Sequence, residues 1–234
     1  MLNFEYILKN FEKRMKTARV EGTNKEFQVG KILCLGRNYA EHAKEMKAEV
    51  PSTPVVFLKP SSAIIRNNEN ITIPRISKEP HHEVELVVAI GKTGKNINAN
   101  TARQHILGYG IGLDMTLRDI QNEAKEKGLP WSVAKGFDSS APISDFIPSE
   151  RIKDPHDLTI RCTVNGTMRQ QSSTKEMIFS IDQIIEFTSS IFTLEPGDLI
   201  FTGTPEGVSR VNNGDIIEAE LVGFTKISHR VTFA

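Results

Sequence analysis

The segment HHEVELVVAIG, residues 81–91, places two carboxylates at the start of an apolar run. The aliphatic and β-branched residues predict a buried strand that ends at Gly91. Alternate side chains of a strand point to opposite faces, so Glu83 and Glu85 share one face, opposite Val84 and Leu86. Two residues of extended chain span about 6.6 Å at ~3.3 Å per residue, which lets both carboxylates reach one ligand.

Two carboxylates in a low-dielectric core raise each other's pKa and cost stability unless a cation joins them. Hard divalent cations such as Mg²⁺, Mn²⁺ or Ca²⁺ prefer carboxylate oxygens. The alternative is that both glutamates pair with Lys or Arg, or lie at the solvated end of the strand. The spacing alone leaves a metal site and a pair of satisfied glutamates both open.

The rest of the chain predicts many short strands and few helices. Strands are expected within 32–36, 55–59, 108–116, 158–170, 195–208, 212–224 and 226–234, and Asn165-Gly166 signals a hairpin. Helices are expected within 37–47, 98–109, 117–128 and 178–192, the first with Asn38 and Glu41 as a capping box. The regular βαβ alternation of a doubly wound fold is missing. The pattern therefore predicts a mainly β (α+β) fold with short flanking helices.

Residues 1–29 form a peripheral extension in this scheme, with an amphipathic helix near the start, and residues 30–234 form the main domain. Basic and acidic residues number 29 each, which is not the clustered basic excess of a nucleic-acid-binding surface. No apolar stretch approaches the ~20 residues of a membrane span. Cys34 and Cys162 lie far apart without metal-ligand spacing. We expect a cytoplasmic protein, or a mitochondrial one if the source is eukaryotic and the N-terminus is processed.

Two further segments contain candidate metal-binding, substrate-binding and catalytic residues. Asp114 lies where a glycine-rich strand meets a helix, and it is either a third metal ligand or an N-cap. Arg118 and Gln121 follow on one helix side, where both could bind a substrate carboxylate. The alternative is that Arg118 is a surface ion-pair partner. His42 and Glu45, at i and i+3, form either a general base with its orienting carboxylate or a surface pair.

Two other segments could meet an anion. Lys135 lies among apolar and small residues, where burial is costly without an anionic partner, unless its ammonium group reaches solvent. FTGTPEGV, residues 201–208, offers backbone N–H groups and a threonine hydroxyl that could bind a carboxylate or oxyanion. An ordinary turn explains the same residues.

Together these segments resemble the fumarylacetoacetate hydrolase family, over about residues 31–234. The stretches that carry the resemblance are GRNYAEHAKE, PVVFLKPSSA, HHEVELVV, GLDMTLRDIQ, GLPWSVAKGFDSSAPIS, VNGTMRQ and LEPGDLIFTGTPEGV. Residues 113–142 are most similar to the short, single-domain acylpyruvase branch. The resemblance implies the mixed β-sandwich or β-roll of that family, assembled as a homodimer.

The resemblance also implies roles for particular residues. Glu83, Glu85 and Asp114 match the ligands of a divalent cation, typically Mg²⁺. His42 and Glu45 match a water-activating dyad on a lid helix, and Lys135 matches an active-site lysine. Arg118, Gln121 and Thr204 match substrate-facing positions. His81 and His82 are expected beside the site as structural groups and not as ligands.

The resemblance implies cleavage of the C3–C4 bond of small 2-oxo acids through a metal-bound pyruvate enolate. The enzyme would be an acylpyruvate hydrolase, which is a hydrolase, or an oxaloacetate decarboxylase, which is a lyase. Arg37 and Lys59 are candidates for a further cation at the distal end of the substrate. The alternatives are a tautomerase or isomerase of 2-oxo dioates, which needs only proton transfer on the same enolate, and a non-catalytic 2-oxo-acid-binding protein. The sequence leaves the preferred substrate and the native metal open.

Overall fold

The structure, a computed structural model, describes residues 16–46 and 49–234. The helix expected near the start of the chain lies outside these residues. The largest sheet of the described chain has eight strands. Seven lie side by side in the order β4 (Val55–Lys59), β3 (Ile32–Gly36), β15 (Leu199–Phe201), β8 (Val84–Ile90), β9 (Ile106–Leu113), β11 (Ala141–Ile143) and β5 (Ile64–Arg66), and β12 (Ile147–Pro148) pairs with β9.

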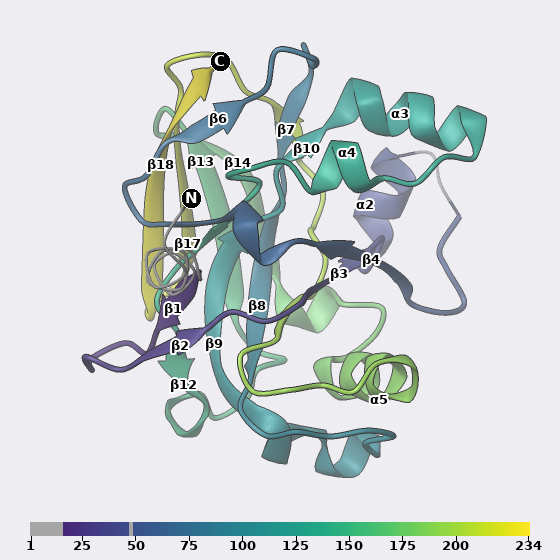
Figure 1. Ribbon diagram of the computed structural model, residues 1–234, viewed down its shortest axis with the longest axis vertical. Helices are drawn as coiled ribbons and strands as arrows, with labels where there is room; N and C mark the ends of the chain where they lie inside the picture. Colours follow the sequence, from purple (N-terminus) through teal and green to yellow (C-terminus); the bar gives the residue numbers. More distant parts are fainter. Residues whose placement is uncertain (1–15, 47–48) are drawn as a thin grey trace, which may run out of the picture.

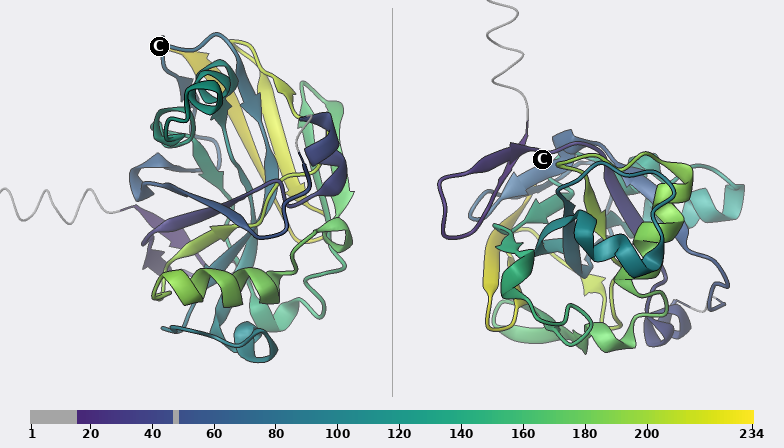
Figure 2. Two further views of the ribbon diagram at one scale, coloured as in Figure 1. Left: turned by 90° about the vertical axis from the view of Figure 1, so that its right-hand side faces the viewer. Right: turned by 90° about the horizontal axis from the view of Figure 1, so that it is seen from below.

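A second sheet of five strands faces the first, and both curl (Figures 1 and 2). Its order is β14 (Thr167–Ser173), β13 (Thr159–Val164), β17 (Ile216–Leu221), β18 (Thr225–Phe233) and β6 (Ile71–Ile73). A small sheet contains β10 (Thr116–Leu117), β7 (Pro80–His82) and β16 (Ser209–Arg210). Parallel pairs such as β3–β15 occur beside antiparallel pairs such as β8–β9. The mainly β, mixed α+β roll predicted from the sequence is confirmed.

Short helices flank the sheets. They are α2 (Ala40–Glu45), α3 (Arg118–Lys127), α4 (Ser132–Lys135) and α5 (Ile181–Ile191), with 3₁₀ turns η1 (Ser61–Ala63), η2 (Ala99–His105), η3 (Ser149–Arg151) and η4 (Thr174–Glu176). Helices α2, α3 and α4 gather around the end of the molecule where β8 begins, whereas α5 lies near its opposite end (Figure 1). No helix of the described residues is long and apolar enough to cross a membrane.

Strand β8 is buried along its whole length, and its two faces pack into different hydrophobic cores. Val84, Leu86, Val88 and Ile90 belong to the main core, which also takes residues of the second sheet. Val87 and Ala89 point the other way into a smaller core that includes Phe201. Glu83 and Glu85 fall on this second face, as the period of two predicts.

Several local predictions are confirmed. The Asn165-Gly166 hairpin joins β13 to β14. Helix α3 ends at Gly128 in the left-handed conformation, at φ 63°. In α5, the four residues expected on one face are all buried; they are Ile181, Ile184, Ile185 and Thr188. The segments expected to form strands at 32–36 and 55–59 coincide with β3 and β4.

Two local predictions are wrong, and the alternative of Asp114 as an N-cap is excluded. Asn38 does not cap α2, because its amide is used by more distant backbone groups: it donates to the carbonyl oxygens of Phe179 and Thr202 and accepts from the Phe179 N–H. The helix expected at 98–109 is only the 3₁₀ turn η2, since from Ile106 onward the backbone pairs with β8. Asp114 is not an N-cap, because α3 begins after Leu117.

Part of the expected N-terminal extension packs against the main body. Strands β1 (Thr17–Arg19) and β2 (Glu26–Gln28) form a hairpin. The Phe146 N–H donates to the Arg19 carbonyl at 2.8 Å, and Ala18 is buried in the smaller core. The boundary at residue 29 stays a prediction.

Candidate active site

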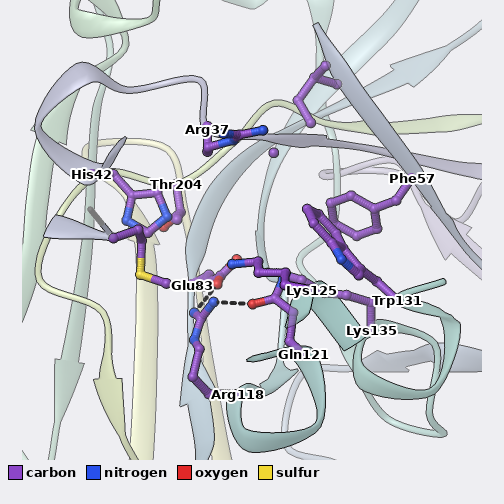
Figure 3. A pocket seen from close by; sticks show the side chains of 13 residues that line it. Arg37, His42, Phe57, Glu83, Arg118, Gln121, Lys125, Trp131, Lys135 and Thr204 are labelled. Carbon is purple, nitrogen blue, oxygen red and sulfur yellow. Dashed lines mark hydrogen bonds and ion pairs between the residues drawn. The ribbon is translucent and has the colours of Figure 1, made fainter. Parts of the chain in front are cut away.

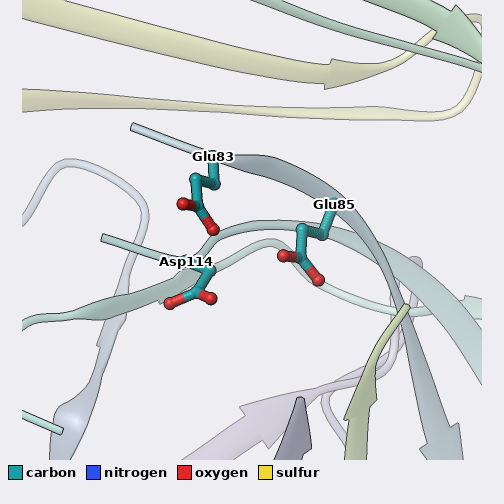
Figure 4. A group of neighbouring side chains, drawn as sticks. All are labelled: Glu83, Glu85 and Asp114. Carbon is teal, nitrogen blue, oxygen red and sulfur yellow. The ribbon is translucent and has the colours of Figure 1, made fainter. Parts of the chain in front are cut away.

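Three buried carboxylates meet where β8 begins and β9 ends (Figure 4). Each of Glu83, Glu85 and Asp114 offers an oxygen, and these oxygens lie within 4.8 Å of one another. The antiparallel register sets this arrangement, because Glu85 pairs with Gly112 and the Asp114 N–H donates to the Glu83 carbonyl at 2.8 Å. None of the three residues is more than 5% exposed. The expected third carboxylate therefore comes from the residue directly after β9, the strand that pairs with β8.

Two cationic side chains hold Glu83. The Lys135 ammonium group lies 2.8 Å from Glu83 Oε2 and 2.5 Å from Asp114 Oδ2, and the Arg118 guanidinium pairs with Glu83 Oε1. Burial alone would raise the pKa of Glu83, but the charges of Lys135 and Arg118 outweigh it and hold that pKa well below its usual range. Burial would likewise lower the pKa of Lys135, which Asp114 and Glu83 instead raise.

Lys59 corrects one expectation. It was a candidate for a cation at the distal end of the substrate, and the structure places it beneath Asp114 instead, with a fully buried side chain. Its ammonium group lies 2.8 Å from Asp114 Oδ1 and donates to the carbonyls of Met115 and Lys135 and to the Ser140 hydroxyl. No signal in the local sequence distinguishes this lysine, which ends an otherwise apolar strand.

Glu85 differs from the other two carboxylates. Within the described chain no cationic side chain forms an ion pair with it, and the Gly203 N–H donates to its Oε2 at 2.7 Å. Burial, followed by the charges of Asp114 and Glu83, raises its pKa well above the usual value. A divalent cation among these three hard oxygen donors would place a positive charge beside Glu85, so the residues present fit Mg²⁺, Mn²⁺ or Ca²⁺.

His42 and Glu45 form the expected pair on α2. Nδ1 of His42 lies 3.3 Å from Glu45 Oε2, and the Glu45 carboxylate also accepts from the Gly207 N–H at 3.1 and 3.2 Å. A carboxylate beside Nδ1 favours the tautomer with its proton there and leaves Nε2 free to accept a proton. Burial lowers the pKa of His42. The imidazole is thus buried and oriented, and the alternative of a surface pair is excluded for His42.

Glu83, His42, Arg118 and Lys135 line one cavity of ≈340 Å³ (Figure 3). Arg118 and Gln121 lie side by side on α3, where Arg118 Nη1 donates to Gln121 Oε1 at 2.6 Å. The Thr204 hydroxyl accepts from Gln170 Nε2 at 2.8 Å. The lining side chains with a predicted role are Arg37, His42, Glu83, Arg118, Gln121, Lys135 and Thr204, and the others include Phe57, Lys125 and Trp131.

The two histidines before Glu83 lie beside this site. His82 is fully buried, with Nδ1 at 2.9 Å from Gln170 Oε1 and Nε2 at 2.8 Å from the Ser209 hydroxyl. Burial and the nearby Arg118 charge lower the pKa of His81 to about 4. Neither histidine belongs to the carboxylate cluster found in the described residues. Gln170, which contacts both His82 and Thr204, was not singled out by the sequence, where it is one polar residue in an alternating strand.

Comparison with known proteins gives the context of this geometry. The model of the fumarylacetoacetate (FAA) hydrolase C-terminal domain matches residues 31–232. The oxaloacetate tautomerase FAHD1, mitochondrial, of Mus musculus is 50% identical over 200 residues, covering 86% of this chain and 90% of the mouse protein. The oxaloacetate decarboxylase, mitochondrial, of Dictyostelium discoideum is 48% identical over 202 residues, covering 86% and 93%.

A solved structure agrees with these relatives. The fumarylpyruvate hydrolase of Pseudomonas aeruginosa, in complex with Mn²⁺ and pyruvate, superimposes with a TM-score of 0.91 at 37% identity, covering 94% of this chain and 97% of that one. The matched length, the shared fold and the identities all point to one conclusion. The chain belongs to the fumarylacetoacetate hydrolase family.

Proposed function

We propose that this protein cleaves the C3–C4 bond of small 2-oxo acids in a Mg²⁺-dependent reaction, as an acylpyruvate hydrolase or oxaloacetate decarboxylase. The observation that carries the proposal is the buried cluster of three carboxylates, which lies beside a cavity that also presents a base and several cations. Glu83, Glu85 and Asp114 would hold the cation. When bound, it would act as a Lewis acid on the oxygens of the 2-oxo acid.

The side chains of the cavity have complementary tasks in this scheme. Arg118 and Gln121 would bind the substrate carboxylate, and Arg37 would face its distal end. Lys135 would place a positive charge beside the oxygen on which negative charge develops. For hydrolysis of an acylpyruvate, His42 Nε2 would take a proton from water while Glu45 stabilises the imidazolium. Loss of CO₂ from oxaloacetate needs no attacking water, so His42 would matter less there.

Keto–enol tautomerisation of oxaloacetate is the second candidate. It is favoured by the 50% identity to the mouse protein named oxaloacetate tautomerase. The same cavity would serve, because the reaction only removes a proton from C3 and adds one to the 2-oxo oxygen while the cationic groups bind the dioate. A non-catalytic protein that binds 2-oxo acids is the third possibility, and the oriented His42–Glu45 pair speaks against it.

The deciding experiment assays acetylpyruvate, oxaloacetate and fumarylpyruvate in parallel, with NMR detection to separate C–C cleavage from tautomerisation. We expect cleavage of at least one substrate with Mg²⁺ and none in EDTA. Tautomerisation without cleavage would select the second candidate, and activity that persists in EDTA would contradict the metal requirement. Assembly as a homodimer and a cytoplasmic or mitochondrial location stay predictions, the first to be tested by sedimentation velocity.

The role of Glu85 gives a sharper test of the metal site. Glu85→Gln should abolish Mg²⁺-dependent turnover and reduce Mg²⁺ affinity measured by calorimetry, because it removes the carboxylate that lacks a protein cation. The fold should remain, since the variant no longer buries a charge. Glu218→Gln, on the exposed face of β17, is the matched control. Equal Mg²⁺ affinity in the two variants would contradict the assignment of Glu85 as a ligand.

A further inference from the structure

Gln170 uses its whole hydrogen-bonding capacity behind the cavity wall. Its Oε1 accepts from the Val84 N–H at 3.0 Å and from His82 Nδ1 at 2.9 Å. Its Nε2 donates to the Pro205 carbonyl at 2.8 Å and to the Thr204 hydroxyl at 2.8 Å. A primary amide has two donors and two acceptor positions, and all four are occupied here.

Two backbone groups fix which way this amide points. The Val84 N–H can only donate, so the atom that faces it must be the amide oxygen. The Pro205 carbonyl can only accept, so the atom that faces it must be the amide nitrogen. The orientation of Gln170 therefore follows from its neighbours, and Nε2 must donate its second hydrogen to Thr204 Oγ1.

The consequence falls on the hydroxyl of Thr204, a residue that lines the cavity. A hydroxyl has one hydrogen to donate and two lone pairs. One lone pair already receives the Gln170 hydrogen, and within the described residues no hydrogen bond uses the Thr204 proton. That proton is free to point at a ligand, where it suits an oxygen that accepts, as in a carboxylate or a 2-oxo group.

His82 supports the amide from behind. Because the Gln170 oxygen can only accept, His82 Nδ1 must carry the hydrogen between them. The other ring nitrogen contacts the Ser209 hydroxyl at 2.8 Å, so both ends of the imidazole are fixed between β14 and β16. Both His82 and Gln170 are almost fully buried.

We propose that Gln170, held in place by His82, is a positioning residue that orients the Thr204 hydroxyl as a donor toward an anionic or carbonyl oxygen of the ligand. This inference rests on the proposed function, since it assumes a 2-oxo acid or a related dicarboxylate in the cavity. With the Thr204 hydroxyl held as a donor, the ligand atom beside it must accept a hydrogen bond.

A double-mutant cycle tests the relay. Oxalate, which resembles the enolate of pyruvate, is titrated calorimetrically with Mg²⁺ into the wild type, Gln170→Met, Thr204→Val and the double variant. A hydrogen bond to a charged group is worth enough to change the dissociation constant by about tenfold to a hundredfold. We expect each single change to weaken oxalate binding by that factor, and the double variant to be no weaker than Thr204→Val.

The controls separate positioning from folding. Thr204→Ser restores the hydroxyl that Thr204→Val removes and should recover the oxalate affinity lost in that variant. Gln171→Met, at the exposed neighbour on β14, should bind oxalate like the wild type. If Gln170→Met does not fold, Gln170→Glu replaces it, because a carboxylate oxygen opposite Thr204 would draw its proton away from the cavity. Losses from Gln170 and Thr204 that multiply in the double variant would overturn the inference.

Turnover of the wild type is measured separately on the three 2-oxo acids. Oxalate binding with a coupled cycle but no turnover would contradict only the proposed reaction. Turnover with an uncoupled cycle would contradict only the role of Gln170. If the wild type bound no oxalate in the presence of Mg²⁺, the inference about Gln170 and Thr204 would be overturned.

Discussion

Lys135 is a buried cation whose charge is balanced by two neighbouring carboxylates. It is 2% exposed, and its ammonium group contacts one oxygen each of Glu83 and Asp114. A buried charge that loses its partner typically costs about 3–5 kcal/mol of stability. The lysine and the carboxylates therefore depend on one another, and a change at position 135 must affect both stability and chemistry.

We expect Lys135→Met to lower the free energy of unfolding by about 3–5 kcal/mol in EDTA. Mg²⁺ should restore more stability to the variant than it adds to the wild type, because the cation then balances carboxylates that have lost their ammonium group. Thermal melting with and without Mg²⁺ measures both effects. Lys127→Met, at an exposed lysine, is the control. If Mg²⁺ raised the melting temperature of all three proteins equally, the cation would not be replacing the charge of Lys135.

His42 predicts the pH dependence of hydrolysis. Burial, the largest influence, lowers the pKa of this imidazole from its ordinary value of 6.5. The neutral form, which is the one that accepts a proton, is therefore populated at pH values below 6.5. As pH falls from 7, kcat/KM for acylpyruvate hydrolysis should decline with a midpoint below pH 6.5. His42→Ala should lose both the hydrolysis and this limb, whereas an acid limb at or above 6.5 in the wild type would show that another group is the base.

At the scale of elements, the turn after β15 carries two of the contacts that shape the site. The Gly203 N–H donates to Glu85, and the Gly207 N–H donates to Glu45 on α2. Both glycines have positive φ, 97° and 91°. The turn therefore connects the carboxylate cluster to the helix that carries the proposed base, through backbone donors that require a left-handed conformation.

Gly203→Ala should disturb both the backbone and the metal site. A Cβ at this position would lie 2.6 Å from the Asn38 Cβ, in addition to the strain of the positive φ. Gly223→Ala is the matched control, because Gly223 has φ 82° and no atom within 4 Å of an added Cβ. We expect a larger loss of unfolding free energy and of Mg²⁺ affinity for Gly203→Ala, measured by urea denaturation and calorimetry. Equal effects of the two changes would mean that left-handed strain alone is responsible.

At the scale of the whole molecule, local periodicity predicted the parts of the site that depend on one strand or one helix. The alternation in β8 placed Glu83 and Glu85 on one face, and the helical spacing in α2 and α3 paired His42 with Glu45 and Arg118 with Gln121. Such patterns fix which side of its own element a residue occupies.

These periodic patterns do not predict which distant element the buried side of a strand or helix will contact. Lys59 contacts Asp114 across 55 positions, and Gln170 contacts Val84 across 86. Asn38 satisfies the local rule for a helix cap, yet its amide bonds to Phe179 and Thr202 instead. These contacts come from sheet order and curl, which hydrophobic period alone leaves undetermined.

A buried histidine remote from the cavity should make the stability of the whole fold depend on pH. His229 on β18 is 1% exposed, and its Nδ1 lies 2.8 Å from the Glu69 carbonyl. A carbonyl only accepts, so the proton must be on Nδ1. Its Nε2 is buried without a partner among the described residues. Burial lowers the pKa of His229 from 6.5.

The sign of the effect follows from proton uptake. Below pH 6.5 the imidazole is protonated in the unfolded chain but stays neutral in the folded chain. The unfolded state therefore binds more protons, and the free energy of unfolding decreases as the pH is lowered. The loss should approach about 1.4 kcal/mol per pH unit until the pKa of the folded state is reached. His229→Gln cannot take up this proton, so its unfolding free energy, measured by urea denaturation in EDTA, should fall less than that of the wild type between pH 7 and pH 5. Parallel losses in the two proteins would assign the acid sensitivity to other groups.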